Sequence, residues 1–519
     1  MKRQRKIPVK HYVLRRLAAC LSAALLAVAV PLVAHGTESV ALNVETPAMP
    51  ANPPKTWLTY HLAHPGPSGA SPGDPNPAFY YKGRYHLHYI YNHKDGYAFA
   101  HVSSTDMVHW KWHPTTLTPK RTGHGMFSGT GFFTKEGTPA MIYHGWTSGR
   151  NQIAFALDDL LEQWSKPIAL ESLTASGEKP NMAPLNHDDY WDPDCWFMDD
   201  SYYALSGGSH PKLMKSPDLK QWLFLGELFH DRFPANLGVE KGEDVSCANM
   251  FKIGDKWMLL CISHGLGARY YLGDFRDEKF LPDHHALLNW ARWDFFAPES
   301  LLTKDGRRVM WAWCTPLVND WQRADRQKNF DNLMNPSIFQ QGIQSLPREL
   351  SLPKDGVLRM KPLRELEELR HDEKRVRNIT VKSDTIRLLD DIQGDTIEME
   401  VVIASPTAKE FGINLLCDEK GENGFSILSG VGSKTLTVAY IKPPFELEEN
   451  EDLTLRIFID KSMIEVFAND RQAAVAWHEY APEHLHVSLF TKGGDLVVKQ
   501  VTAWKMKSIY EGNCVFEGK

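Results

Sequence analysis

Acidic residues at three places along the chain could together cleave a glycosidic bond. Asp74 and Asp192 each precede a proline, and Glu243 is followed directly by Asp244. Each place comes shortly before an aromatic-rich segment with the pattern of a β-hairpin. Enzymes that cleave glycosides generally hold two carboxyl groups on either side of the scissile bond. The sequence therefore predicts glycosidase chemistry, provided that the fold brings these distant acids together.

Five aromatic-rich hairpins at nearly constant spacing are the elements that would position the acids. Their turns lie 51 to 63 residues apart, at Gly83, Gly137, Asp200, Asp255 and Gly306. Self-similarity at this period is typical of a β-propeller of four-stranded blades. Since the strand that opens each blade lines the central channel, acids that precede the hairpins can converge there. We therefore predict an all-β chain in which residues 56–350 form a five-bladed β-propeller.

A second β domain is predicted after the propeller. Residues 351–377 form a connector, and apolar residues at helical spacing predict a short helix in Pro362–Arg370. Polar and apolar residues then alternate, as in Thr396–Val401 and Leu455–Asp460. Many short strands with this period predict a C-terminal antiparallel β-sandwich over residues 378–519.

The N-terminus has the features of a signal peptide. Lys2–Arg16 is basic, Leu17–Val33 is apolar, and small residues lead up to Gly36. We therefore predict that residues 1–36 are a signal peptide and that the polar residues 37–55 are a linker. A secreted or periplasmic protein with no membrane partner after cleavage is expected.

Composition narrows the range of partners. The net charge of −6 gives no electrostatic case for binding nucleic acid. The histidines show no metal-ligand spacing and no phosphate-binding loop is present, so no metal and no cofactor are predicted. The six cysteines beyond the signal peptide are scattered, and we expect buried free thiols. The predicted partner is a small or polymeric carbohydrate, and the sequence does not indicate an oligomeric state.

Six short motifs, in the same order along the chain, resemble those of glycoside hydrolase family 32, the β-fructosidases such as invertases, inulinases and levanases. They are Asp74–Pro77 with its following hairpin, Ser104–Trp110, Phe127–Thr130, Asp192–Pro193, Ser345–Leu350 and Arg456–Phe467. The resemblance covers nearly all of the chain after the signal peptide. It implies a five-bladed propeller followed by a sandwich, in agreement with the repeat pattern.

The resemblance also implies roles for individual residues. Asp74 corresponds to the nucleophile of a retaining mechanism, and Asp192 to the acid that holds sugar hydroxyls and stabilises the transition state. Asn76, Phe127 and Ser128 fall in motifs that would contact substrate. Trp191 and Ser246 are also expected there but depart from the family pattern, since Trp191 replaces an arginine before the Asp-Pro pair. A stacking surface in place of a cation would change the substrate contacts.

The general acid/base is the main departure from the family. The family motif is Glu-Cys-Pro, whereas Ser246 precedes Cys247 here. A serine hydroxyl cannot donate a proton as a tuned carboxylic acid does. Glu243 has the longer side chain and a β-bulge could aim it inward, while Asp244 lies two residues from Ser246 and therefore on the same face of a strand. We expect one of these two to serve, with Glu243 slightly preferred, unless the ordinary acid is missing.

The resulting expectation is a secreted glycosidase that cleaves the β-fructofuranosidic bonds of sucrose, inulin or levan by double displacement. The replaced glutamate leaves open a catalytically impaired, carbohydrate-binding propeller. A transglycosylase would use the same covalent intermediate, and other furanosides such as arabinofuranosides also stay possible substrates. The sequence does not distinguish endo from exo cleavage.

Overall fold

The computed structural model describes residues 55–64, 70, 72–114, 116–182, 190–290, 294–315, 340–478 and 480–510. The predicted signal peptide, all but the last residue of the predicted linker and Cys514 lie outside these residues. Within them, no helix has both the length and the apolar character needed to cross a bilayer.

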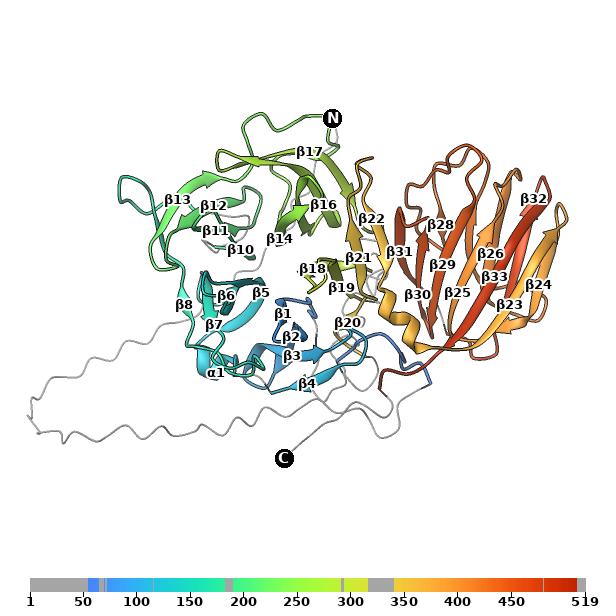
Figure 1. Ribbon diagram of the computed structural model, residues 1–519, viewed down its shortest axis with the longest axis horizontal. Coiled ribbons are helices and arrows are strands. Elements are labelled where there is room, and N and C mark those ends of the chain that lie inside the picture. Colours follow the sequence, from blue (N-terminus) through green and yellow to red (C-terminus); the bar gives the residue numbers. More distant parts are fainter. Residues whose placement is uncertain are drawn as a thin grey trace, which may run out of the picture. The chain divides into compact units, whose positions relative to one another are not determined.

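All five predicted hairpins are present, and each supplies the first two strands of an antiparallel blade (Figure 1). The first two blades consist of β1 (Ala78–Tyr81), β2 (Arg84–His93), β3 (Gly96–Ser104) and β4 (Lys111–His113), and of β5 (Gly125–Phe133), β6 (Pro139–Trp146), β7 (Arg150–Phe155) and β8 (Ile168–Ala169). The short helix α1 (Pro119–Thr122) precedes the second blade.

The third blade comprises β10 (Pro193–Met198), β11 (Ser201–Ser206), β12 (Lys212–Ser216) and β13 (Trp222–Glu227), with β9 (Ser172–Leu173) at its outer edge. The fourth comprises β14 (Ser246–Ile253), β15 (Lys256–Ser263), β16 (Gly267–Arg276) and β17 (Lys279–Leu287). The fifth comprises β18 (Phe296–Leu302), β19 (Arg308–Cys314), β21 (Arg348–Ser351) and β22 (Arg359–Pro362), with β20 (Ile343–Gln344) beside β19.

The strands that open the blades lie around one common centre (Figure 1). The opening strands β1, β5, β10, β14 and β18 contact one another although they are far apart in sequence. Aromatic side chains fill the space between blades, for example Phe79, Phe99 and Trp164 between the first two blades. The abundance of aromatic residues is therefore explained largely by core packing between the blades.

Two stacked sheets form the C-terminal β-sandwich, as predicted. One sheet has the order β23-β33-β25-β29-β30-β31 and the other β24-β32-β26-β27-β28. The strands are β23 (Arg370–Val381), β24 (Ile386–Gln393), β25 (Thr396–Ile403), β26 (Glu410–Cys417), β27 (Phe425–Ser429), β28 (Thr437–Val438), β29 (Leu453–Asp460), β30 (Met463–Ala468), β31 (Gln472–Trp477), β32 (His486–Lys492) and β33 (Leu496–Met506).

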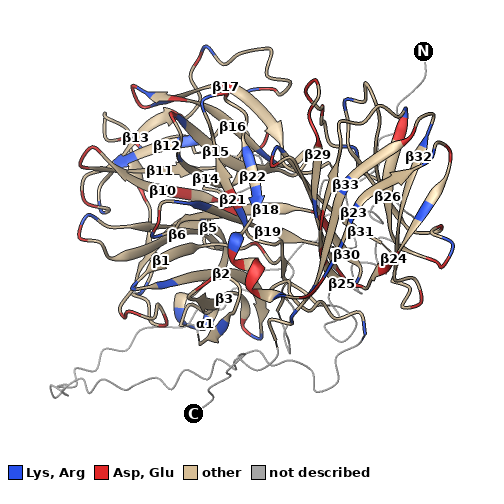
Figure 2. Ribbon diagram, turned by 45° about the vertical axis from the view of Figure 1, so that its right-hand side comes forward, with Lys and Arg blue, Asp and Glu red and all other residues tan. Residues whose placement is uncertain are grey.

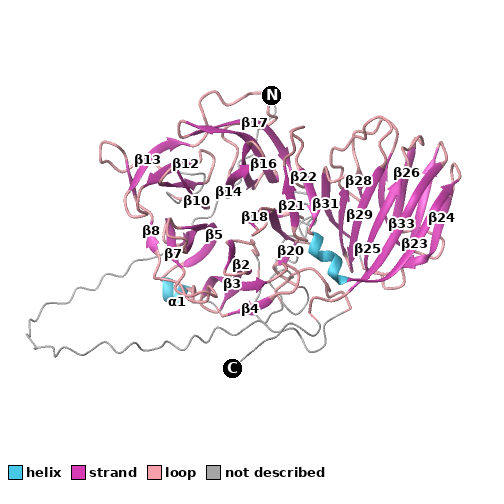
Figure 3. Ribbon diagram, in the orientation of Figure 1, coloured by secondary structure: helices cyan, strands magenta, loops and turns pink. Residues whose placement is uncertain are grey.

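The helix predicted in the connector is a 3₁₀ helix, η2 (Arg364–Leu369), which Figure 3 shows beside the sandwich strands. It buries Leu366 and Leu369. The predicted connector 351–377 also contains β22 and the beginning of β23. Residues of both charge signs are scattered over the strands and turns (Figure 2), in keeping with the small net charge.

Candidate active site

Irregular backbone at the start of the opening strands determines where the candidate site residues point. The pairing of β5 with β6 shifts between Met126 and Gly129, and the pairing of β14 with β15 shifts between Ser246 and Asn249. Such bulges place an extra residue in one strand and re-aim the neighbouring side chains. The first shift includes Ser128, and the second includes Cys247, whose φ is 48°. These distortions turn both side chains toward the acids.

Asp74 and Asp192 meet at the thiol of Cys247. Its Sγ lies 3.7 Å from Asp74 Oδ2 and 3.6 Å from Asp192 Oδ2. Ser128 Oγ donates a hydrogen bond of 2.5 Å to Asp74 Oδ2, and the Cys247 amide donates one of 3.0 Å to Asp192 Oδ2. All four residues are buried. The propeller thus brings together two carboxyl groups that are far apart in the sequence.

Burial alters the ionisation of both acids. It raises the pKa of Asp74 to about 6, against the opposing effect of the hydrogen bonds from Ser128 and Cys247. It raises the pKa of Asp192 to about 7, and the nearby charge of Asp74 acts in the same direction. Two carboxyl groups this close cannot ionise independently. Perturbed acids in one cluster are typical of functional sites.

One buried oxygen of this cluster has no hydrogen-bond partner. Among the described residues, Asp192 Oδ1 is buried without any donor. An unsatisfied buried carboxylate oxygen is costly unless a ligand supplies the missing donor. A sugar hydroxyl is a suitable donor. This oxygen is therefore a candidate contact for a carbohydrate.

Asp244 is bound by three groups around the same site. Its Oδ1 accepts a 2.8 Å hydrogen bond from Ser246 Oγ, and its Oδ2 lies 2.6 Å from His264 Nδ1 and accepts the His264 amide at 3.0 Å. Burial would raise the pKa of Asp244, but these contacts with His264 and Ser246 together lower it. Asp244 lies just before β14 and contacts Ser246, the first residue of that strand, through this hydrogen bond.

Glu243 is placed differently. Its carboxylate accepts a hydrogen bond from the Ser263 hydroxyl, at the end of β15. The charge of Glu243 contributes to raising the pKa values of Cys261, Arg269 and Tyr271, which belong to β15 and β16. The β14 bulge lies after Glu243 rather than at it, so it aims Cys247 and not Glu243 toward the acids.

Two further predicted binding residues are Asn76 and Phe127. Asn76 is buried, and its Oδ1 accepts the Gly129 amide at 3.3 Å. Phe127 stacks on Trp146 with 4.7 Å between ring centroids. Tyr97 packs edge-on against Phe127, with 5.0 Å between the centroids of these two rings. Trp146 is 37% exposed. A partly exposed aromatic surface of this kind suits stacking against a sugar ring.

Comparison with known proteins agrees with this architecture. Residues 64–362 match the model described as "Glycosyl hydrolases family 32 N-terminal domain", and residues 365–505 match "Glycosyl hydrolases family 32 C terminal". The chain belongs to glycosyl hydrolase family 32. The family and the enzyme class predicted from the motifs, a β-fructofuranosidase-like glycosidase, are thereby confirmed.

Relatives of this family 32 protein match most of its length. It is 25% identical to a sucrose-6-phosphate hydrolase of Escherichia coli, over 86% of this chain and 94% of that one. It is 26% identical to a levanase of Bacillus subtilis (strain 168), over 84% of this chain and 69% of that one.

Solved structures support the fold. Fructan 1-exohydrolase IIa from Cichorium intybus is 19% identical and aligns with a TM-score of 0.67, over 88% of this chain and 98% of that one. A structure of that plant protein in complex with 1-kestose aligns with a TM-score of 0.70 at 18% identity, over the same shares of the two chains. These likenesses confirm the five-bladed propeller followed by a sandwich.

The two main departures from the family 32 motifs contact each other. Trp191 Nε1 donates a 2.9 Å hydrogen bond to Ser246 Oγ. The ring of Trp191 also lies 5.1 Å from that of His144. The indole therefore fixes the hydroxyl that stands at the position of the family's glutamate. The two replacements form one altered part of the site.

Sequence reasoning did not anticipate Cys247 or give His264 a definite role. Cys247 was expected only to be a buried thiol, as the structure shows for all five described cysteines. His264 follows the last residue of β15, and its pairing with Asp244 joins two segments of the blade that no local motif connects. Glu299, which also begins a hairpin, is a buried residue whose burial raises its pKa well above the usual range.

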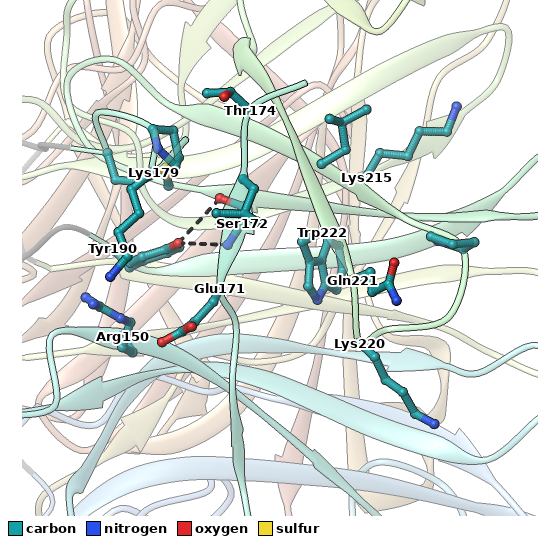
Figure 4. Close-up of a pocket in the computed structure, with 15 residues that line it drawn as sticks. Arg150, Glu171, Ser172, Thr174, Lys179, Tyr190, Lys215, Lys220, Gln221 and Trp222 are labelled. Carbon is teal, nitrogen blue, oxygen red and sulfur yellow. Dashed lines mark hydrogen bonds between the residues drawn. The ribbon is translucent and has the colours of Figure 1, made fainter. Parts of the chain in front are cut away.

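Two other clusters are separate from the acids. One ligand atom from each of Asp106, His109 and Glu368 lies within 4.8 Å of the other two, so these residues could hold a cation. Asp106 already binds local amides and the His109 ring. A cavity of about 580 Å³ lies beside β9 and β13 (Figure 4), and its lining includes Arg150, Tyr190 and Trp222. None of the predicted site residues lines this cavity.

Proposed function

We propose that this family 32 glycosidase is exported and hydrolyses β-fructofuranosides with retention of configuration. Asp74 attacks the anomeric carbon, and Asp192 binds ring hydroxyls and stabilises the positive charge that develops as the bond breaks. The observation that carries the proposal is the buried, unsatisfied Asp192 Oδ1 beside the thiol that also contacts Asp74.

The surroundings of Asp74 suit a nucleophile. With a pKa of about 6, Asp74 is largely ionised at neutral pH. Hydrogen bonds from Ser128 and Cys247 orient one of its oxygens. A nucleophilic carboxylate needs this combination of ionisation and fixed orientation.

The substrate class is inferred from the relatives. They include a sucrose-6-phosphate hydrolase, a raffinose invertase and levanases. All of these names refer to fructose-containing carbohydrates, so sucrose, inulin and levan are the substrates to test. The aromatic surface of Phe127 and Trp146 would stack against part of such a chain.

A second candidate function is carbohydrate binding without turnover. The observation in its favour is Ser246, which stands where the family has its acid/base glutamate. Such a protein would bind fructans yet release no fructose.

Sugar release from sucrose, inulin, levan and aryl arabinofuranosides tests these proposals. We expect fructose release by the wild type and a loss of at least about a thousandfold in Asp74→Asn. Asp231→Asn is the control, because this carboxylate is 97% exposed and should leave the rate unchanged. Assays of separate cell fractions and medium locate the activity and test export.

Each contrary result has a definite meaning. Binding to the same carbohydrates without release identifies the binder. Release of arabinose alone overturns the choice of fructofuranosides. Transfer of fructose to a second sugar identifies a transglycosylase.

A further inference from the structure

The site needs a proton donor for the leaving oxygen, and Ser246 cannot supply it. Its hydroxyl accepts a hydrogen bond from Trp191 Nε1 and donates its own hydrogen to Asp244 Oδ1. The only proton of this side chain is therefore already directed at a carboxylate. Ser246 links Trp191 to Asp244 and has no spare proton to give.

Asp244 is also unsuited to this role. A general acid must hold its proton until the leaving oxygen takes it. The hydrogen bonds from His264 and Ser246 instead stabilise the ionised carboxylate, which lowers the pKa of Asp244. Asp244 is therefore an anion that positions other groups.

His264 combines the features that Ser246 and Asp244 lack. Its Nδ1 is held 2.6 Å from Asp244 Oδ2, and its amide is bound by the same oxygen. The side chain is 52% exposed, so it can reach a ligand. The His264 ring lies edge-on to that of Phe296, with 6.1 Å between centroids. Phe296 belongs to β18, the opening strand of the fifth blade.

The charges of the proposed site acids also act on this imidazole. The hydrogen bond with Asp244 raises the pKa of His264 despite partial burial, and the charges of Asp192 and Asp74 add to the effect. Glu243 is a further nearby acid, since its Oε1 would lie 3.5 Å from a Cβ placed on Gly265. Asp244, Asp192 and Asp74 are thus the charged groups that act on His264, and Arg269, which binds the backbone carbonyl of Asp244, is a cation beside the same segment. The acids favour the imidazolium form of His264.

We propose that His264, oriented by Asp244, is the general acid/base that replaces the glutamate of family 32. The inference rests on the proposed function, because it needs Asp74 as nucleophile. His264 would be the catalytic residue. Asp244 and Ser246 would be positioning residues that act through it.

The two chemical steps balance with this donor. Asp74 attacks the anomeric carbon, and the glycosidic bond breaks with its electron pair moving to the leaving oxygen. That oxygen takes a proton from Nε2 of His264, because Nδ1 is held by Asp244. The neutral imidazole then removes a proton from water, whose oxygen displaces Asp74 from the anomeric carbon. The products are the free sugar, a hemiketal, and the alcohol formed by the leaving group, and the enzyme regains its original protonation state.

Glu243 is the rival donor, and its contacts argue against it. Its carboxylate is bound to Ser263, and its charge acts on β15 and β16. Arg269 of β16 also binds the backbone carbonyl of Asp244, which holds this segment in place. The charges of both Asp74 and Asp192, in contrast, act on the ring of His264.

The deciding experiment compares His264→Gln with Glu243→Gln, using His109→Gln as a matched control. His109 also binds a carboxylate, Asp106, at 2.9 Å and is 35% exposed, but it lies on the turn between β3 and β4. On sucrose or inulin we expect His264→Gln to lose about a hundredfold to ten-thousandfold in kcat, and the other two variants to stay near wild type.

Further readouts separate proton transfer from misfolding. Azide needs no general base, so it should react with the covalent intermediate of His264→Gln and yield fructosyl azide. In the wild type, kcat/KM should fall at alkaline pH as His264 loses its proton. This alkaline limb of the pH profile should disappear in His264→Gln. In Asp244→Asn that limb should move to lower pH, because the imidazolium loses its carboxylate partner.

The assignment would be overturned if Glu243→Gln, and not His264→Gln, were rescued by azide and lost the alkaline limb of its pH profile. The titration of His264, followed by nuclear magnetic resonance of the labelled imidazole, is independent of turnover. A pKa above that of free histidine that falls in Asp244→Asn supports the pair. If the wild type shows this pair but cleaves no fructofuranoside, the proposed function fails and the donor role fails with it.

Discussion

At the scale of single residues, the candidate site holds two carboxyl groups in surroundings that oppose their ionisation. Asp74 and Asp192 are buried side by side, and few donors compensate for lost water. A carboxyl group whose pKa is raised by folding destabilises the folded state wherever it is ionised. The site therefore has a cost in stability that substrate hydroxyls would offset.

This cost can be measured with Asp74→Asn. Since the folded pKa is about 6 and the usual value is 3.8, the folded state binds the proton more tightly than the unfolded state. The stability of the wild type should fall as pH rises from about 4 to 7, by about 3 kcal/mol from this group. Asparagine cannot ionise, so Asp74→Asn should be the more stable protein at pH 8.

Urea unfolding at pH 5 and pH 8 tests this expectation. The advantage of Asp74→Asn over wild type should be larger at pH 8 than at pH 5, while Asp231→Asn should show no such trend. An advantage that is equal at both pH values would mean that Asp74 does not titrate as burial predicts.

The sequence allowed some site residues to be predicted and hid others for a physical reason. Asp74, Asp192 and Ser128 belong to short motifs whose local backbone determines where they point. His264 becomes meaningful only through its contact with Asp244, which depends on how β15 turns back beside the segment before β14. The local sequence of neither segment indicates that the two segments of the blade will be in contact.

At the scale of elements, the hairpin repeat was predictable and the bulges were not. The turns carry glycines or acidic residues with positive φ, for example 81° at Gly83 and 82° at Gly306, and these residue types identify turns in a sequence. A bulge needs only one extra residue and no special residue type. The third and fourth strands of the fifth blade were also obscured, because residues 340–362 supply them only after a long separation from β19.

The β5 bulge depends on Gly129. A Cβ at this position would lie 2.0 Å from the Ile142 carbonyl oxygen and 2.4 Å from Tyr143 Cα, both in the backbone of β6. Gly129→Ala should therefore push β5 from β6 and displace Ser128 from Asp74. We expect a loss of about 1–3 kcal/mol in the free energy of unfolding, typical of overpacking, and at least a tenfold loss in kcat.

Gly137→Ala in the turn of the same hairpin is the comparison. Nothing lies within 4 Å of a Cβ there, although φ is +81°. It should lower stability by about 1 kcal/mol through backbone strain and leave kcat unchanged. Equal losses of kcat in both variants would show that the bulge does not position Ser128.

At the scale of the whole molecule, the propeller and the sandwich share a buried charged network. Glu465 of β30 accepts a 2.8 Å hydrogen bond from Arg348 of β21, and both side chains are fully buried. His61, before the first blade, lies 2.9 Å from Asp460 and 3.3 Å from Glu465. Around it, the apolar core of the first, fourth and fifth blades continues into Phe458, Met463 and Phe467 of the sandwich.

This network should make the stability of the protein depend on pH at the alkaline end. Burial alone would lower the pKa of His61, but hydrogen bonds to Asp460 and Glu465 raise it to about 9. The folded state therefore binds the proton more tightly than the unfolded chain. The stabilisation of about 3 kcal/mol is fully present below pH 6.5 and is lost as pH rises through 9.

His61→Gln should remove this dependence, because glutamine keeps hydrogen-bonding groups but cannot become a cation. Between pH 6 and pH 9.5, the midpoint of thermal unfolding should fall more in the wild type than in His61→Gln. His371→Gln, at an exposed position of β23, should behave like the wild type. His61 contacts Asp460 and Glu465 of the sandwich directly. If the midpoint of the wild type is the same at both pH values, the positive charge of His61 does not stabilise the contact between the two domains.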